Sequence, residues 1–205
     1  MKMAYVQQIS AGLKEGLAEC GFAAKRDQLI LTVNAEIVGT VSLNIASHRS
    51  DGLVGVAPII GIESVSIRSM LGELIKLKHG APQPSLTSAI GYLMPEARFL
   101  EWLFDPKEPV DQRGELVRMC MAIKQYGMEF LRERGSIEEI VRCLETLRFS
   151  FKERAIYHLP VAYRVTGAEE RARDYVHRGL LEMEGRSDVA SQDYRGFAKK
   201  FLSVV

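Results

Sequence analysis

The chain has 205 residues, of which 47% are hydrophobic and 26% are charged, and these fractions are typical of a globular protein. The formal net charge is +1 and is evenly distributed, since residues 1–106 carry 9 basic and 10 acidic side chains and residues 107–205 carry 18 and 16. Nucleic-acid binding usually needs a concentrated basic surface. We therefore expect no nucleic-acid partner.

The three cysteines, Cys20, Cys120 and Cys143, are far apart in the sequence. Each falls at an apolar-periodic position of an expected helix, which is typical of buried thiols in a reducing compartment. Cysteine and histidine do not cluster with the spacing of a zinc site, so we expect no metal and no cofactor. The sequence has no apolar run long enough for a membrane span or a signal peptide. These observations predict a cytoplasmic protein with no membrane partner.

The first half of the sequence alternates between two periodicities. Residues 3–20 carry apolar side chains at helical spacing, and Gly21 stands where helices commonly end. Residues 64–77 return to the helical period. β-Branched residues between these helices, and after a loop rich in glycine and proline, predict strands. The four expected strands are residues 28–34, 36–45, 53–62 and 86–94.

Three details refine the expected sheet. Asn34 and Ala35 separate the first two strands and predict a tight connection. Pro58 lies inside the third strand, and a proline at this position favours a strand end, an edge or a bulge. The fourth strand, residues 86–94, is apolar on both faces, which indicates an interior position.

Residues 86–106 contain the only tryptophan, Trp102, within a strongly apolar segment. Pro95 suits the first turn of a helix, and residues 97–104 placed on that helix would be apolar over more than half its circumference. The favoured interpretation is a joint covered by the sheet on one side and by the following helices on the other. The alternative is a protein-binding patch centred on Trp102, with Tyr92 and Met94 beside it.

The residues after Pro106 and Pro109 are expected to be helical. Gly135 ends the first of these helices, and Ser136 with Glu139 forms a capping box at the start of the next. Residues 155–183 resemble one tetratricopeptide-like helical hairpin, although a simple antiparallel helix pair with small facing residues is favoured. The expected helices are residues 110–133, 136–148, two within 155–183, and 191–202.

Catalytic signatures are weak. Residues 47–51 bring Ser47, His48 and Asp51 together in one loop, but adjacent polar residues in a turn seldom form an oriented triad with an oxyanion hole. The glycines of residues 52–61 lack the spacing of a phosphate-binding loop. The remaining histidines, at positions 79, 158 and 177, stand alone. We therefore expect no enzymatic activity.

Several segments carry a family resemblance: "CGF", "VSLNIASHR", "VGVAPIIGI", "GYLMPE", "EWLF" and "DYRGFAKKFL". In this order they resemble a family of uncharacterised bacterial proteins of similar length. That family is similar in outline to cytoplasmic immunity proteins, which neutralise toxins exchanged between competing bacteria. The resemblance implies binding to another protein, such as a bacterial toxin, and assigns no catalytic residue.

Together these observations predict an α+β fold. A layer of about four strands with two or three helices spans residues 1–106, and an all-helical layer with the tetratricopeptide-like hairpin spans residues 107–205, both sharing one core. The expected function is that of a non-enzymatic immunity or inhibitor protein, a monomer or homodimer, that neutralises a partner toxin by occlusion. The alternatives are a scaffold or regulatory module using a helical-hairpin groove, and an enzyme with a dispersed site. The expected partner-binding residues are Tyr92, Arg98, Trp102, His48, Arg49 and Asp51.

Overall fold

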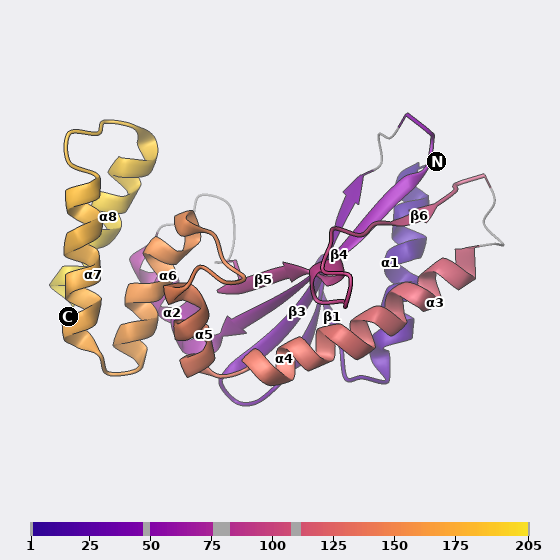
Figure 1. The fold of residues 1–205 in the computed structure, drawn as a ribbon, viewed down its shortest axis with the longest axis horizontal. Helices are drawn as coiled ribbons and strands as arrows, with labels where there is room; N and C mark the ends of the chain where they lie inside the picture. Colours follow the sequence, from indigo (N-terminus) through magenta and orange to yellow (C-terminus); the bar gives the residue numbers. More distant parts are fainter. Residues whose placement is uncertain (1, 47–49, 76–82, 108–111, 205) are drawn as a thin grey trace. The chain divides into compact units, whose positions relative to one another are not determined.

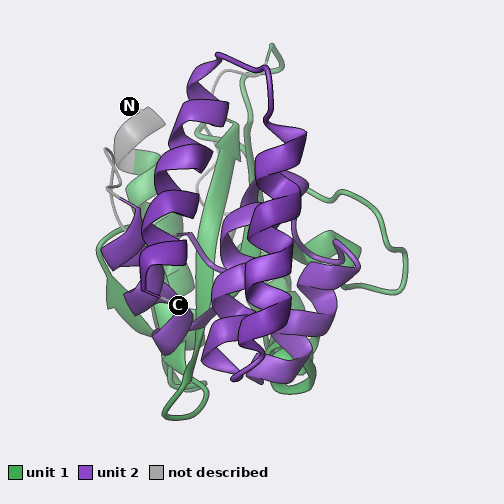
Figure 2. Cartoon of the chain, turned by 90° about the vertical axis from the view of Figure 1, so that its left-hand side faces the viewer, with its two compact units in different colours: residues 1–62, 87–135 green, residues 63–86, 136–205 purple. Residues whose placement is uncertain are grey.

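The computed structural model describes residues 2–46, 50–75, 83–107 and 112–204, which form an α+β fold (Figure 1). The chain divides into two compact units, each built from two separate stretches of sequence (Figure 2). Unit 1 comprises residues 1–62 and 87–135, and unit 2 comprises residues 63–86 and 136–205. The boundary expected at residue 106 falls inside unit 1, and the core expected to be shared across that boundary stays a prediction.

Within the described residues the sheet contains six strands, whereas four were expected. The two additional strands, Ala23–Lys25 and Trp102–Phe104, were missed because three residues are too few to show an alternating pattern. In order across the sheet the strands are β1 (Ala23–Lys25), β2 (Gln28–Thr32), β3 (Ile37–Ala46), β4 (Val54–Ser64) and β5 (Leu86–Ala89), with β6 (Trp102–Phe104) paired to β4. β1 pairs with β2, β2 pairs with β3 and β4 pairs with β6, each in the antiparallel direction.

The connection between β2 and β3 is tight, as predicted. The Asn34 side-chain oxygen Oδ1 accepts hydrogen bonds from the backbone N–H groups of Glu36 and Ile37, at 2.9 and 2.8 Å. This is the local turn chemistry for which asparagine is favoured. It fixes a register in which the buried residues Leu29 and Val41 lie opposite each other.

Pro58 neither ends nor interrupts β4, which continues from residue 54 to residue 64 between β3 and β5. The prediction of a strand end at this proline is therefore wrong, whereas an edge or a bulge there stays a prediction. A proline has no backbone N–H and so removes one hydrogen-bond donor from the strand pairing. Burial of the apolar side chains along β4 stabilises the extended strand in spite of this loss. The fully buried side chains of this strand are Val54, Val56, Ile60 and Ile62.

The helices of unit 1 are α1 (Lys2–Ala18) and a continuous helical run formed by α3 (Gln112–Ala122), the π-helical turn η2 (Ile123–Gly127) and α4 (Met128–Arg134) (Figure 1). The helix expected over residues 110–133 is thus confirmed over the described residues, apart from its π-helical turn. The helical run packs on the sheet through two glycines. Gly39 of β3 faces the Leu131 side chain, and Gly127 faces Ile60 of β4.

Unit 2 contains the helices α2 (Val65–Leu74), α5 (Ile137–Glu145), α6 (Lys152–Val165), α7 (Glu169–Glu182) and α8 (Val189–Ser203). Among them α6 packs against α2, α5 and α7, while α8 packs against α7 and α2. The core of unit 2 includes a chain of aromatic contacts that runs from Tyr157 of α6 to Phe197 of α8, with ring centroids 5.1 Å apart, and on to Phe201.

Side-chain caps begin three of these helices. The Ser136 hydroxyl accepts a hydrogen bond from the Glu139 N–H at 3.2 Å, which confirms this part of the predicted capping box. Ser64 caps α2 and Asp188 caps α8 in the same way. Each cap satisfies a backbone donor that would otherwise lack a partner at a helix N-terminus.

The helix pair α6–α7 is joined by a short turn in which Gly167 has a φ of +78°, a conformation that favours glycine. The buried Tyr163 hydroxyl donates to the Glu145 carboxylate at 2.7 Å, and the Arg171 guanidinium lies 4.3 Å from the centre of the same ring. Burial and the hydrogen bond to Glu145 raise the pKa of Tyr163 to about 12. These contacts fasten α5, α6 and α7 together, and the resemblance to a tetratricopeptide hairpin stays a prediction.

The end of α5 has a leucine where helices usually place glycine. The Arg148 N–H donates to the Cys143 carbonyl at 2.8 Å and the Leu147 N–H donates to the Leu144 carbonyl at 3.3 Å, so the turn is a Schellman motif. Leu147, at the position that closes this motif, has a φ of +53°. A side chain in this left-handed conformation costs about 1–2 kcal/mol relative to glycine.

We expect Leu147→Gly to raise the free energy of unfolding by up to about 1 kcal/mol, because it relieves this strain while the leucine side chain that it removes is 46% exposed. Urea denaturation followed by circular dichroism would measure the change. The control is Leu147→Ala, which removes a similar apolar surface but keeps the Cβ atom and gives no relief. An equal effect of both substitutions would contradict this account.

Candidate protein-binding surface

Residues 90–104 lead from β5 to β6 as a short, folded-back segment of unit 1. It begins with the 3₁₀ turn η1 (Ile90–Tyr92), continues through bends and enters β6. The Arg98 N–H donates to the Gly91 carbonyl at 3.2 Å, and the backbone reverses at Ala97, where φ is +46°. A Cβ atom at position 91 would collide with the Arg98 carbonyl oxygen, so only glycine permits this close approach.

The helix expected over residues 95–104 is therefore wrong. The apolar side chains of this region follow a strand period at its end, where Trp102 and Phe104 are buried and Leu103 between them is exposed. Trp102 lies opposite Val56 in the β4–β6 ladder. Backbone N–H and C=O groups of β6 find hydrogen-bond partners in β4. In the expected helix these groups would have been paired within the helix itself.

This segment exposes three large apolar side chains. Tyr92 is 53% exposed, Phe99 is 48% exposed and Leu103 is 42% exposed. Single exposed apolar residues are common, but several together in one short segment are typical of a surface that contacts another molecule. We call residues 90–104, with these three side chains, the apolar strap.

The structure places two of the expected partner-binding residues, Tyr92 and Arg98, in exposed positions on the apolar strap. The Gly91–Arg98 hydrogen bond brings their backbones close together. Trp102 belongs to the same segment but is only 6% exposed, so it contributes to the core of unit 1. This burial agrees with the favoured interpretation that the segment is covered, although a strand and not a helix carries Trp102, and although Trp102 was expected to bind a partner.

The other expected partner-binding residues belong to the polar loop before β4. His48 and Arg49 lie outside the described residues. Asp51 is exposed, and its carboxylate oxygen Oδ1 accepts a hydrogen bond from the Leu53 N–H at 3.0 Å. This is the turn-stabilising role expected for an aspartate at that position.

Phe99 and Leu103 were missed as surface residues. In the expected helix, both residues belonged to the apolar side chains that cover more than half of its circumference, and side chains on such a face are expected to be buried. The alternation from residue 102 to residue 104 is the only local signal that could have placed Leu103 outside, and three residues are too few for it to be decisive.

A serine–histidine pair lies in unit 2. The Ser85 hydroxyl and the His158 Nδ1 atom are 3.0 Å apart, and both residues are buried. Burial, followed by the positive charge of Arg154, lowers the pKa of His158 to about 3. A catalytic histidine needs a neighbour that stabilises its protonated form. The cation beside His158 does the opposite, so this pair suits a structural hydrogen bond.

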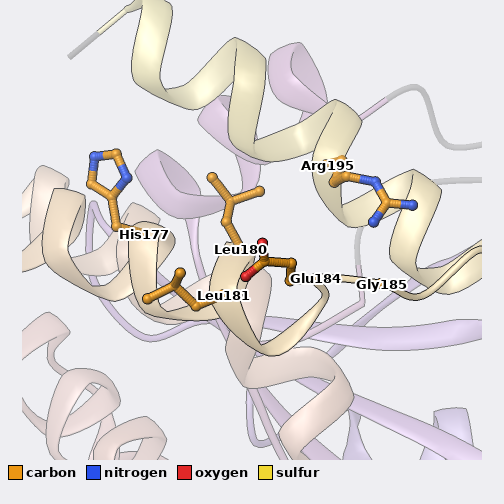
Figure 3. A pocket seen from close by; sticks show the side chains of 6 residues that line it. All are labelled: His177, Leu180, Leu181, Glu184, Gly185 and Arg195. Atoms are coloured by element: carbon orange, nitrogen blue, oxygen red, sulfur yellow. The ribbon is translucent and has the colours of Figure 1, made fainter.

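A shallow depression of about 470 Å³ lies where α7 meets α8 (Figure 3). Leu180, Leu181 and Glu184 line it from the α7 side, and Arg195 lines it from α8. The Arg195 guanidinium donates to the backbone carbonyls of Met183 and Arg186 at 3.0 and 2.8 Å. Arg195 therefore binds α8 to the end of α7 and to the connection between the two helices, and use of a helical-hairpin groove by this protein stays a prediction.

Among the described residues, no group of three or more histidine, cysteine, aspartate or glutamate side chains is arranged to hold a metal ion. No helix within the described part of the chain has the length and apolar character needed to cross a membrane. Comparisons with models of protein families, with curated proteins and with solved structures find no match.

Proposed function

We propose that this protein is a non-enzymatic binding protein that contacts a protein partner through the apolar strap. The observation that carries the proposal is the exposure of Tyr92, Phe99 and Leu103 on one short segment with a defined backbone. Tyrosine and arginine are enriched among residues that dominate binding energy, and Arg98 adds a guanidinium to this surface. A segment with fixed backbone loses little conformational entropy on binding.

The mode of action in this proposal is occlusion, as in an immunity or inhibitor protein that neutralises a bacterial toxin. The resemblance described above supports this class. The nearly neutral, evenly spread charge supports contact dominated by apolar side chains, with little electrostatic steering of the encounter. An enzymatic role has less support, because the buried Ser85–His158 pair lies beside a cation.

We expect the double substitution Tyr92→Ala and Phe99→Ala to weaken binding by more than about 2 kcal/mol, which corresponds to roughly 30-fold in Kd. The full-length protein would be used to capture partners from the organism that encodes it, and the Kd of the captured partner would then be measured for each variant. Thermal melts would test whether the variants remain folded.

The matched control is Phe151→Ala, which removes an aromatic side chain that is 68% exposed but belongs to unit 2. It should leave the Kd unchanged. Unchanged binding by the folded double variant would refute the apolar strap as the contact surface. Chemical turnover of the partner, in place of stoichiometric inhibition, would refute occlusion.

A further inference from the structure

The helices α1 and α3 of unit 1 approach closely along a line of two glycines. Gly12 faces the Leu116 side chain, and one turn later Gly16 faces Cys120. A Cβ atom at position 16 would lie 2.6 Å from the Cys120 Sγ atom, so this sulfur rests directly on the α1 backbone. From the first of these contacts to the second, the residue number rises by four on both helices, from 12 to 16 on α1 and from 116 to 120 on α3. The two helices therefore run parallel.

Cys20 lies four residues beyond Gly16, in the turn after α1, where its N–H donates to the Leu17 carbonyl at 3.1 Å. The Cys20 thiol is close enough to the Cys120 thiol for the two groups to interact electrostatically. Cys20 is partly exposed, whereas Cys120 is buried. One sulfur at this contact is thus open to a small reagent, and the other is covered.

Lys124 adds a positive charge to the same place. It lies one turn beyond Cys120 and forms an ion pair with Glu19, the residue before Cys20. Its ammonium group interacts electrostatically with both Cys20 and Cys120. A nearby cation favours the thiolate, which is the reactive form of cysteine. Cys20 is the thiol that a reagent reaches first, because it is partly exposed and Cys120 is buried.

We infer that Cys20 and Cys120 form an oxidative modification site, at which a peroxide converts two thiols into one disulfide between α1 and α3. The Cys20 thiolate attacks a peroxide oxygen and breaks the O–O bond, giving a sulfenic acid and hydroxide. The Cys120 sulfur then attacks the Cys20 sulfur, the S–S bond forms and the sulfenic oxygen leaves as water after protonation. The two sulfurs are oxidised and the peroxide is reduced.

Cys143 provides an internal comparison, because it is buried in α5 of unit 2. The reduced, full-length protein would be treated with hydrogen peroxide under native conditions, and free thiols would be alkylated and counted by intact mass. We expect two of the three thiols to be lost. Peptide mapping should join Cys20 to Cys120, and dithiothreitol should restore all three thiols.

Cysteine and lysine variants test whether oxidation is specific to Cys20 and Cys120. Cys143→Ser should form the same disulfide, while Cys20→Ser and Cys120→Ala should form none. Lys124→Gln should slow the loss of thiols without changing the product. The same treatment in denaturant should give mixed pairings that include Cys143. The inference is overturned if native wild-type protein gives a disulfide that includes Cys143, a disulfide between chains, a sulfinic acid at Cys20, or no loss of thiols.

Discussion

Replacing Trp102 with alanine is expected to lower the free energy of unfolding by about 3–5 kcal/mol, the range for removal of a large buried aromatic side chain. Trp102 is 6% exposed, and its neighbour in the ladder, Val56, is fully buried. Phe104 lies two residues along the strand and faces the same side. Alanine at position 102 would leave a cavity among these side chains that the paired strands cannot close by small shifts.

The control is Leu103→Ala on the same strand, because the Leu103 side chain points to the exposed side. It should cost about 1 kcal/mol or less. Urea denaturation should be followed by circular dichroism, since Trp102→Ala removes the only tryptophan and its fluorescence. If Trp102→Ala instead leaves stability unchanged and abolishes partner binding, Trp102 is a binding anchor and the core assignment fails.

Local signals in the sequence predicted a large part of the fold. The Ser136–Glu139 pair located the start of α5 because a cap depends only on residues within one turn. Asn34 located the β2–β3 turn for the same reason. The long helix of residues 110–133 was recognisable because it repeats its apolar pattern over several turns, although the sequence pattern did not reveal the π-helical turn η2.

Residues 95–104 show why an apolar pattern alone was insufficient. Their path is set by the Gly91–Arg98 hydrogen bond and by pairing with Val54–Val56, which lie far away in the sequence. Neither interaction produces a periodic apolar pattern within the segment. The division into units was missed for the same reason. α2 belongs to unit 2 because it packs against α6 and α8, and residues 87–135 of unit 1 separate it from these helices in the sequence.

The candidate surface was predicted in part. Tyr92 and Arg98 were chosen from the sequence, and both are exposed on the apolar strap. Phe99 and Leu103 were not chosen, because only the strand geometry distinguishes exposed from buried positions among adjacent apolar residues. Contacts such as Ser85–His158 join residues 73 positions apart and could not be anticipated from either residue alone.

That buried contact leads to the second large effect, a dependence of stability on pH. His158 is 6% exposed, and burial together with the Arg154 charge keeps its pKa at about 3 in the folded protein. In the unfolded chain the histidine pKa is about 6.5. Between these two values the unfolded chain binds a proton that the folded protein does not bind, so acidification favours unfolding.

We therefore expect the contribution of His158 to stability to be complete above pH 6.5 and to be lost progressively as the pH falls towards 3. Each pH unit inside this window costs about 1.4 kcal/mol, so about 3 kcal/mol is lost between pH 7 and pH 4. Urea denaturation of the wild type and of His158→Gln across this range would measure the loss.

Because carboxylates also titrate in this pH range, the informative quantity is the difference between the two profiles of unfolding free energy against pH. His177→Gln, which changes an exposed histidine, should follow the wild-type profile. Parallel profiles for wild type and His158→Gln would show that His158 is protonated in the folded protein near its ordinary pKa. The assignment of His158 as a buried, neutral imidazole would then be wrong.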